Sequence, residues 1–404
     1  MAVAQPPKAS VAAQVPGRLI ALKIVAALGL LAAILLSWPL WLSRRSFPLS
    51  PVIQWLPELC RPWDAMWLVA LLVLLAATVL LPRRRWPTLA VVLVAAGLCL
   101  WDQTRWQPWV YQYLFLLAAT VCYRRKDAVS CRPASELDVA LLIVAFTYFY
   151  SGVQKCNVTF FTATAPWFMG PATRLLPESM GAFIRRWPQS APAIEIAIGL
   201  GLLLSRTRSA AAVAAVCTHA FVLFTLGPFG YNWNSVIWPW NIAMAAVTLI
   251  VAWRRPGAPP LTLVWRAREA IFPKIIFLLF GVTPLLSFAG RWDMYLSAAL
   301  YSGNLSGGSV DFSGHLYNQL PPGVQAQCRP SGKGRYALPL PLWAMAEMNV
   351  PDYPADRVYR QVAETLRRRI EPDDQVVLTV LGQPQIMTGA RTTTVSVFAG
   401  TSSE

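Results

Sequence analysis

The chain has 404 residues, of which 56% are hydrophobic and only 13% are charged. Soluble domains carry about a quarter of charged residues, so this composition excludes an ordinary soluble globular protein and indicates a membrane protein. The formal net charge is +16, but the arginines stand in small groups between apolar runs, as at Arg83–Arg85. Arginines placed in this way act as topology signals, and binding to nucleic acid is not expected.

Residues 1–17 are rich in Ala, Pro and Gln and predict a disordered N-terminus. Residues 18–290 contain recurring apolar runs, and a bilayer requires about 20 apolar residues for each helical span. Shorter runs would span with the help of tilt, local thinning or Trp and Tyr anchors. The pattern predicts about nine transmembrane helices, at roughly 19–42, 64–82, 87–102, 108–123, 137–155, 189–205, 209–227, 234–253 and 273–290.

Basic residues are distributed unevenly between alternate loops. With the N-terminus inside, the inner loops hold most of the arginines, whereas the outer turns at 103–107 and 228–233 hold only Arg105. The positive-inside rule therefore predicts an N-terminus inside and a C-terminus outside. The outer loop at 156–187 mixes apolar and basic residues, which favours an interfacial segment.

After residue 290 the composition changes to that of a small soluble domain. Residues 295–330 are rich in Gly, Ser and Asn and predict irregular structure. An amphipathic pattern predicts a helix at Val358–Ile370, and β-branched runs predict strands at Gln375–Leu381 and Thr392–Phe398. The predicted fold class is thus an all-α polytopic membrane bundle with a small external α+β domain at 291–404.

Ionisable residues inside apolar runs mark the candidate site. Lys155 ends the fifth run, Glu195 lies in the sixth and His219 in the seventh. Such residues are rare in membranes and usually face the bundle interior or a watery cavity. The predicted topology places Lys155, His219 and the turn 232–234 in the outer half, where one cavity could hold them.

Each of these residues also has a structural interpretation. Lys155 could extend to the membrane interface, and His219 could hydrogen-bond between helices. Glu195 could pair with Arg185 or Arg186. The chemical interpretation requires a lysine that can lose its proton, which burial in a hydrophobic pocket favours, and such a lysine is a suitable base or nucleophile. The cysteines show no metal-ligand spacing, and no metal is predicted.

The run Tyr148-Phe-Tyr-Ser-Gly-Val-Gln-Lys-Cys-Asn157 resembles the corresponding helix end in the HTTM family, which includes the vitamin K-dependent γ-glutamyl carboxylases. A second similarity is Thr218-His219-Ala220 followed by Leu-Phe-Thr-Leu-Gly at 223–227. Bacterial members of the family are also similar at 105–109 and 238–241. The resemblance covers roughly residues 20–300 and implies a reduced quinone as cofactor, with Lys155 as its base on the outer side. Two departures are Gln154, where the carboxylases have a second lysine, and a much smaller external region.

The leading hypothesis is a carboxylase-like lyase or quinone epoxidase in the lipid bilayer, acting on a protein or peptide substrate at the outer side. Lys155 and His219 are its predicted catalytic residues, and the predicted binding residues are Asn157, Gln154, Tyr150, Asn234 and Trp238. The alternative is a non-enzymatic membrane scaffold whose external domain binds a secreted partner. A third hypothesis is thiol-redox chemistry at Cys60, Cys156 and Cys328.

Overall fold

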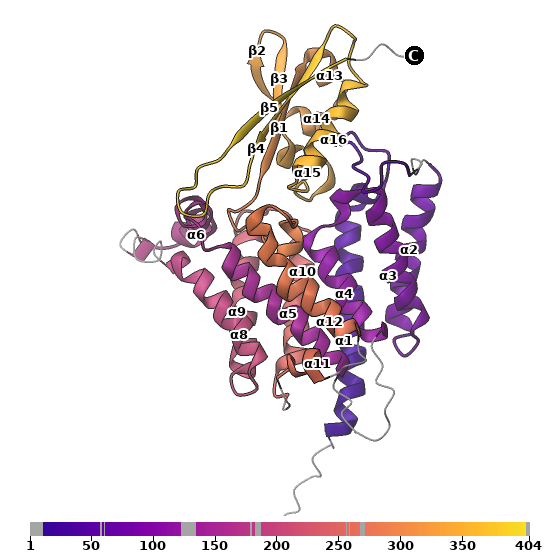
Figure 1. Ribbon diagram of the computed structural model, residues 1–404, viewed down its shortest axis with the longest axis vertical. Coiled ribbons are helices and arrows are strands. Elements are labelled where there is room, and N and C mark those ends of the chain that lie inside the picture. The colour runs from indigo at the N-terminus through magenta and orange to yellow at the C-terminus, as the bar shows by residue number, and fades with distance from the viewer. Residues whose placement is uncertain are drawn as a thin grey trace, which may run out of the picture.

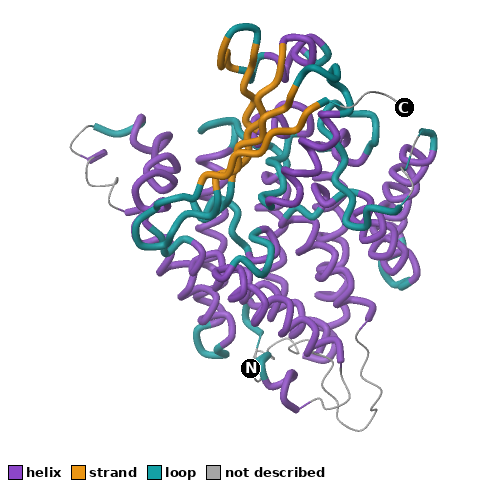
Figure 2. Tube along the Cα trace, turned by 45° about the horizontal axis from the view of Figure 1, so that its top comes forward, coloured by secondary structure: helices purple, strands orange, loops and turns teal. Residues whose placement is uncertain are grey.

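A computed structural model describes residues 11–56, 59, 61–122, 135–177, 180–181, 187–255, 257, 259–266 and 271–400. The helices pack side by side, and a small antiparallel sheet with its own helices stands at one end of them (Figure 1). Figure 2 shows the same division, with the strands gathered on one side of the helical layer.

The apolar runs of the sequence form the helices of this layer. They are α1 (Val11–Leu36), α2 (Trp63–Leu80), α3 (Trp86–Trp101), α4 (Pro108–Cys122), α5 (Ser135–Gln154), α8 (Ala191–Leu203), α9 (Arg208–Leu226), α10 (Ile237–Ala252) and a last segment that begins with α12 (Ile271–Ile276). Among the described residues, five helical segments are long and apolar enough to cross a membrane, namely Gly17–Leu36, Trp63–Leu80, Glu136–Gln154, Arg208–Leu226 and Ile271–Ala289. These apolar helices indicate a membrane-embedded protein. The other four are shorter, so the count of nine spans stays a prediction.

The first helix begins earlier than the sequence pattern suggested. Residues 1–10 lie outside the described residues, but Val11–Gly17, which were expected to be disordered, belong to α1. Alanine and valine continue the apolar helix in this direction, and Pro16 lies only about a turn and a half into it, near the end where a proline costs least.

The last apolar segment changes its helix type along its length. After α12 it continues as a π-helix at Phe277–Val282 and as a 3-10 helix at Thr283–Ala289. The Tyr150 hydroxyl donates a hydrogen bond to the Gly281 carbonyl at 2.6 Å, and Pro284 has no N–H to donate. Both features take a backbone carbonyl or N–H group out of the regular helical hydrogen-bond pattern, which explains the local change in pitch.

Short helices connect the long ones at both ends. The predicted interfacial loop holds a π turn (Phe160–Thr164) and α6 (Ala165–Arg174), and α11 (Thr262–Arg266) follows α10. Short 3-10 turns occupy Trp38–Trp41, Gln103–Arg105, Trp187–Ser190 and Tyr295–Ser297. In Figure 1, α6 lies on the sheet side of the helical layer and α11 at the opposite end.

The C-terminal sheet has five antiparallel strands in the order β2-β3-β1-β4-β5. Their bounds are β1 (Gly307–Ser313), β2 (Arg329–Gly332), β3 (Arg335–Pro339), β4 (Gln375–Leu381) and β5 (Thr393–Ala399). The accompanying helices are α13 (Gly314–Asn318), α14 (Pro322–Gln325), α15 (Leu340–Met348) and α16 (Asp356–Arg367). The prediction of a helix and two strands between residues 358 and 398 is therefore confirmed.

The prediction of irregular structure at 295–330 was wrong, because this segment contains β1, the central strand of the sheet. Its glycine content has a packing reason, since a Cβ on Gly308 would lie 3.0 Å from the Tyr359 ring and 2.9 Å from Leu340. The alternate residues Val310 and Phe312 are fully buried. Two helices thus pack closely on a strand whose small residues resemble a loop in sequence.

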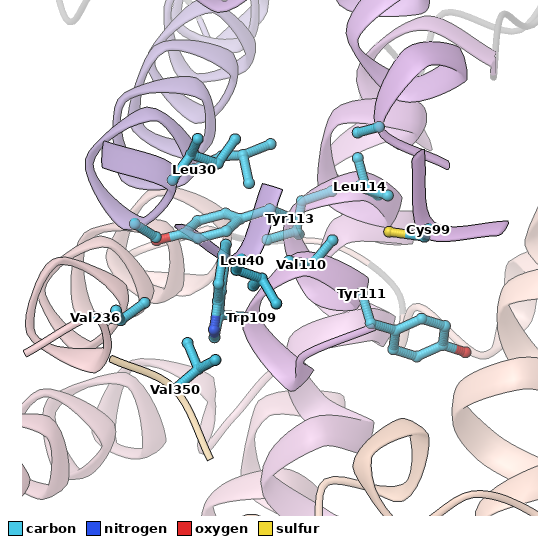
Figure 3. Close-up of a cluster of buried hydrophobic side chains, with 14 of the residues drawn as sticks. Leu30, Leu40, Cys99, Trp109, Val110, Tyr111, Tyr113, Leu114, Val236 and Val350 are labelled. Atoms are coloured by element: carbon cyan, nitrogen blue, oxygen red, sulfur yellow. The ribbon is translucent and has the colours of Figure 1, made fainter. Parts of the chain in front are cut away.

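The sheet domain and the helical layer share one core. Figure 3 shows Val350, which follows α15, close to Trp109 of α4 and Leu40, with Val236 beside them. All four of these side chains are at most 1% exposed. Polar contacts add to the junction, because Glu347 accepts hydrogen bonds from Ser46 and the Gln107 side chain donates to the Pro351 carbonyl. The sheet domain is therefore docked firmly on the helices.

Candidate functional site

Lys155 follows the last residue of α5 and points into the bundle. Its Nζ lies 2.7 Å from Glu195 Oε2 and 2.6 Å from Ser151 Oγ. The residue is 9% exposed, and so is Glu195 on α8. The Lys155 ammonium is therefore directed into the helical bundle, where it forms a buried ion pair.

The sequence did not predict this pairing. Pairing of Glu195 with Arg185 or Arg186 was one structural alternative, and both arginines lie outside the described residues. Ser151 was not recognised as a partner. A signal for Ser151 existed, because Ser151 and Lys155 are four residues apart and therefore share one face of a helix. No sequence spacing connects Lys155 with Glu195, since the two residues lie on different helices.

Two glycines bring α5 and α8 together. A Cβ on Gly152 would lie 2.6 Å from the Pro192 carbonyl oxygen, and a Cβ on Gly199 would lie 2.6 Å from the Phe149 backbone nitrogen. Real Cβ atoms do not approach backbone this closely, so both positions require glycine. Small residues at such crossings let membrane helices approach each other closely. The glycines thus place Glu195 within reach of Lys155.

A second polar group surrounds His219 on α9. Its Nδ1 lies 2.8 Å from Asn241 Oδ1, and its Nε2 lies 2.6 Å from the Tyr148 hydroxyl. The Asn241 amide nitrogen donates to the Ile237 carbonyl, so Asn241 Oδ1 is the acceptor in its contact with the histidine. His219 then carries its proton on Nδ1 and accepts the Tyr148 proton on Nε2.

Both polar groups line the same cavity, which has a volume of about 210 Å³. Its polar lining includes Lys155, Glu195, Ser151, His219, Asn241 and Gln112. The remaining wall is mostly apolar and aromatic, with Tyr111 and Phe280 stacked at 4.8 Å between ring centroids. A few converging polar groups in an apolar cavity are typical of sites for small organic ligands.

The other predicted site residues are divided between the cavity and its supports. Tyr150 lines the cavity, whereas Gln154, Asn157, Asn234 and Trp238 do not. The Asn157 side chain donates to the Ser302 carbonyl and accepts from the Phe160 amide. Asn234, which has a positive φ of 50°, donates to the Tyr301 hydroxyl, and Trp238 donates to the Leu226 carbonyl. These side chains hold the segments that surround the cavity.

Gln154 connects the site with the sheet domain. Its amide nitrogen donates to Ser287 Oγ at 2.8 Å, and its amide oxygen accepts from Asn304 at 2.8 Å. Asn304 in turn accepts from Gln383, which belongs to the loop between β4 and β5. The same loop reaches α6 in both overall views (Figures 1 and 2), and its Ile386 carbonyl accepts from the Val158 amide. The residue before Lys155 is therefore fixed by hydrogen bonds that lead to the sheet domain.

The cysteines of the third hypothesis are placed only in part. Cys156 is an exposed free thiol beside Lys155, and Cys328 is a half-buried free thiol in the sheet domain. Burial raises the pKa of the Cys328 thiol to about 11, which disfavours the reactive thiolate. Cys60 lies outside the described residues.

Comparison with protein-family models, curated proteins and solved structures gave no match to this chain. The class of protein is therefore described from its fold and its site alone. The chain is a membrane-embedded helical protein with a small antiparallel sheet domain, and its helices enclose an apolar cavity that contains a lysine–glutamate pair and a hydrogen-bonded histidine.

Proposed function

We propose that the protein is a quinone-dependent, carboxylase-like membrane enzyme in which Lys155 accepts a proton from the reduced quinone. The observation that carries this proposal is that Lys155, Glu195 and His219 line one largely apolar cavity. An aromatic ring with an ionisable hydroxyl suits this lining, because aromatic walls can pack on the ring while the polar groups reach the hydroxyl. When bound, the reduced quinone would supply the acidic hydroxyl and the reducing electrons.

The lysine–glutamate pair provides a route for the proton. Transfer of one proton from Lys155 Nζ to Glu195 Oε2 along their 2.7 Å hydrogen bond leaves both groups neutral. The lysine nitrogen then has a free electron pair and can take a proton from a hydroxyl in the cavity. The pair ends with one additional proton, which Glu195 or Ser151 can pass onward.

His219 is proposed to orient the bound ring. With its Nδ1 proton held by Asn241, its Nε2 is directed at the Tyr148 hydroxyl. A ligand hydroxyl or carbonyl could replace or extend this contact, since a tyrosine hydroxyl both donates and accepts. Asn234 and Asn157 would act indirectly, by holding the segments around the cavity.

The proposed topology has nine membrane-crossing segments, with the N-terminus inside and the sheet domain outside. The turns that carry Arg83–Arg85, Arg206 and Arg254 join helices at the end of the layer opposite the sheet (Figure 1). Such an asymmetry supports this orientation under the positive-inside rule. The cavity would then lie in the outer half of a bacterial cytoplasmic membrane, near the sheet domain that could bring a peptide substrate.

The test measures consumption of a reduced naphthoquinone by the full chain in lipid nanodiscs. Lys155→Arg is the sharpest variant, because arginine keeps the positive charge opposite Glu195 but is never deprotonated in proteins. We expect wild-type protein to be active and Lys155→Arg to lose activity while inserting normally. Full activity of inserted Lys155→Arg would overturn the assignment of Lys155 as the base.

The scaffold hypothesis predicts a different pattern. Its support is the exposed apolar surface of the sheet domain, where Val395 and Val397 are 59% and 60% exposed. A scaffold would keep its function in Lys155→Ala and lose it when residues 296–404 are deleted. The two variants together therefore discriminate between the two functions.

A further inference from the structure

Strand β5 is the outer strand of the sheet, and no described segment pairs with its far side. Two hydrogen bonds show which of its backbone groups point toward β4: the Gly382 amide donates to the Thr392 carbonyl, and the Gly400 amide donates to the Asp374 carbonyl. Backbone groups alternate along a strand, so a second set points to the free edge. That set belongs to Thr393, Val395, Val397 and Ala399.

Exposed valines lie on the face next to this edge. Val395 and Val397 pair in register with Thr379 and Val377 of β4, so these four side chains share one face of the sheet. Val395 is 59% exposed and Val397 is 60% exposed. The strand sequence Thr-Thr-Val-Ser-Val-Phe-Ala contains no charge. An uncharged, β-branched free edge of this kind is a template for another strand.

The opposite edge of the sheet is protected against such pairing. Strand β2 has only four residues, contains Pro330 and changes its pairing register between Pro330 and Gly332. Short length, proline and an irregular register are features that block strand addition. The neighbouring strands also carry the Arg335–Asp311 ion pair. Only the β5 edge therefore combines free backbone groups with apolar side chains.

A second copy of the chain in the same membrane fits this edge poorly. Strand β5 rises obliquely away from the helical layer (Figure 1). A two-fold axis along the membrane normal would leave the rising component of the strand unchanged, so two copies of β5 would not run antiparallel. Lipid fits poorly as well, because Val397 lies toward the end of the strand that is farther from the helices.

We propose that the β5 edge binds an extended, uncharged peptide segment of another protein by antiparallel strand addition. The outward N–H and C=O groups of Val395 and Val397 supply the main-chain hydrogen bonds, and their side chains with Val377 supply the apolar contact. This mode takes its affinity from main-chain bonds and its selectivity from alternate side chains. The proposal does not depend on quinone chemistry.

The experiment uses the full chain in nanodiscs and a fluorescein-labelled peptide of alternating Thr and Val with a Lys at each end. Val395→Pro removes one outward N–H and places a ring at the edge. It leaves the bonds to β4 intact, because the Val395 N–H does not take part in them. Val395→Thr is the matched control, since threonine keeps both the N–H and the branched shape.

We expect saturable binding to wild-type protein, measured by fluorescence anisotropy, and a loss of affinity of about tenfold or more in Val395→Pro. Val395→Thr should stay within about threefold of wild type, because the main-chain bonds remain. Unchanged thermal stability of Val395→Pro would show that the fold is intact. Equal binding by wild type and Val395→Pro, or no saturable binding by wild type, would overturn the proposal. A wild-type dimer that Val395→Pro converts to a monomer would overturn it in favour of a second copy.

Discussion

The most informative residue-scale feature is the burial of Lys155 and Glu195 as a pair. Removing two charges from water costs several kcal/mol for each ion, and a good mutual contact repays this only in part. Such a pair is therefore weak evidence for stability and stronger evidence for function. The pair lies at the wall of an apolar cavity, where it would be in contact with a bound ligand.

A double-mutant cycle tests the energetic coupling of the pair. Lys155→Met leaves the Glu195 carboxylate buried without its partner and should destabilise the protein by about 3–5 kcal/mol. Adding Glu195→Gln removes the uncompensated charge, so the double variant should regain most of that loss. Denaturant titration in detergent measures the free energy of unfolding of Lys155→Met, Glu195→Gln and the double variant. If the losses of the two single variants simply add in the double variant, the residues are not coupled, and the buried pair is not maintained in solution.

Lys155 and His219 could be predicted as cavity residues from the sequence, because ionisable residues in apolar runs are conspicuous. Their partners could not all be predicted. Ser151 and Tyr148 lie on the α5 face that also carries Lys155, and a helical projection would have grouped them. Glu195 and Asn241 lie on other helices, and their approach depends on packing distances that one sequence does not contain.

At the scale of elements, the contact between α5 and α8 determines the site. Gly152 and Gly199 allow their backbones to touch, and the Lys155–Glu195 bond follows from that approach. The positions of the helices could be read from apolar runs. The closeness of this crossing could not be predicted, since α3 also contains a glycine, Gly97, without any such contact.

A matched pair of alanine substitutions tests this element-scale role. Gly199→Ala places a Cβ 2.6 Å from the Phe149 nitrogen, whereas Gly97→Ala meets nothing within 4 Å. Alanine favours a helix over glycine by about 1 kcal/mol, so Gly97→Ala should be neutral or stabilising. Gly199→Ala should instead destabilise by about 1–3 kcal/mol through overpacking. Thermal unfolding compares them, and equal effects would contradict the close crossing of α5 and α8.

In the sheet domain, too, some elements could be predicted from the sequence and others could not. Strands β4 and β5 and helix α16 carry strong periodic patterns and were predicted close to their observed bounds. Strand β1 was missed because Gly307 and Gly308 resemble a loop, although Leu340 of α15 and Tyr359 of α16 require a small residue at Gly308. The loop between β4 and β5, which reaches the Lys155 segment, has no local signature of that contact.

At the scale of the whole molecule, the junction between the two parts contains a buried aspartate. Asp352 is 4% exposed, and its Oδ2 has no hydrogen-bond partner among the described residues. Burial raises the pKa of Asp352 to about 7, although hydrogen bonds from the Tyr359 hydroxyl and its own backbone oppose the shift. The next residue before it, Pro351, accepts the hydrogen bond from Gln107 of the helical layer.

This pKa shift predicts a pH-dependent stability. The folded state holds the Asp352 proton more tightly than the unfolded state, whose carboxyl has a pKa of 3.8. The contribution of Asp352 protonation to the free energy of unfolding is therefore fully present below about pH 4. It is lost as the pH rises toward about 7, by up to about 1.4 kcal/mol per pH unit. Asp352→Asn should remove this decline, as measured by unfolding at several pH values. Asp356→Asn, at an exposed aspartate, is the control and should leave it unchanged.

We propose that the cavity holds a quinone beside Lys155. A photoreactive naphthoquinone bound to the full chain in nanodiscs, followed by mass spectrometric mapping, tests it most directly. We expect labelling of the cavity-lining parts of α5 and α9, and we expect excess unlabelled quinone to suppress it. Phe280→Trp, which adds bulk to the cavity wall, should lower this labelling. Labelling confined to exposed side chains outside the cavity, such as Val73, with no competition by excess quinone, would contradict a quinone site beside Lys155.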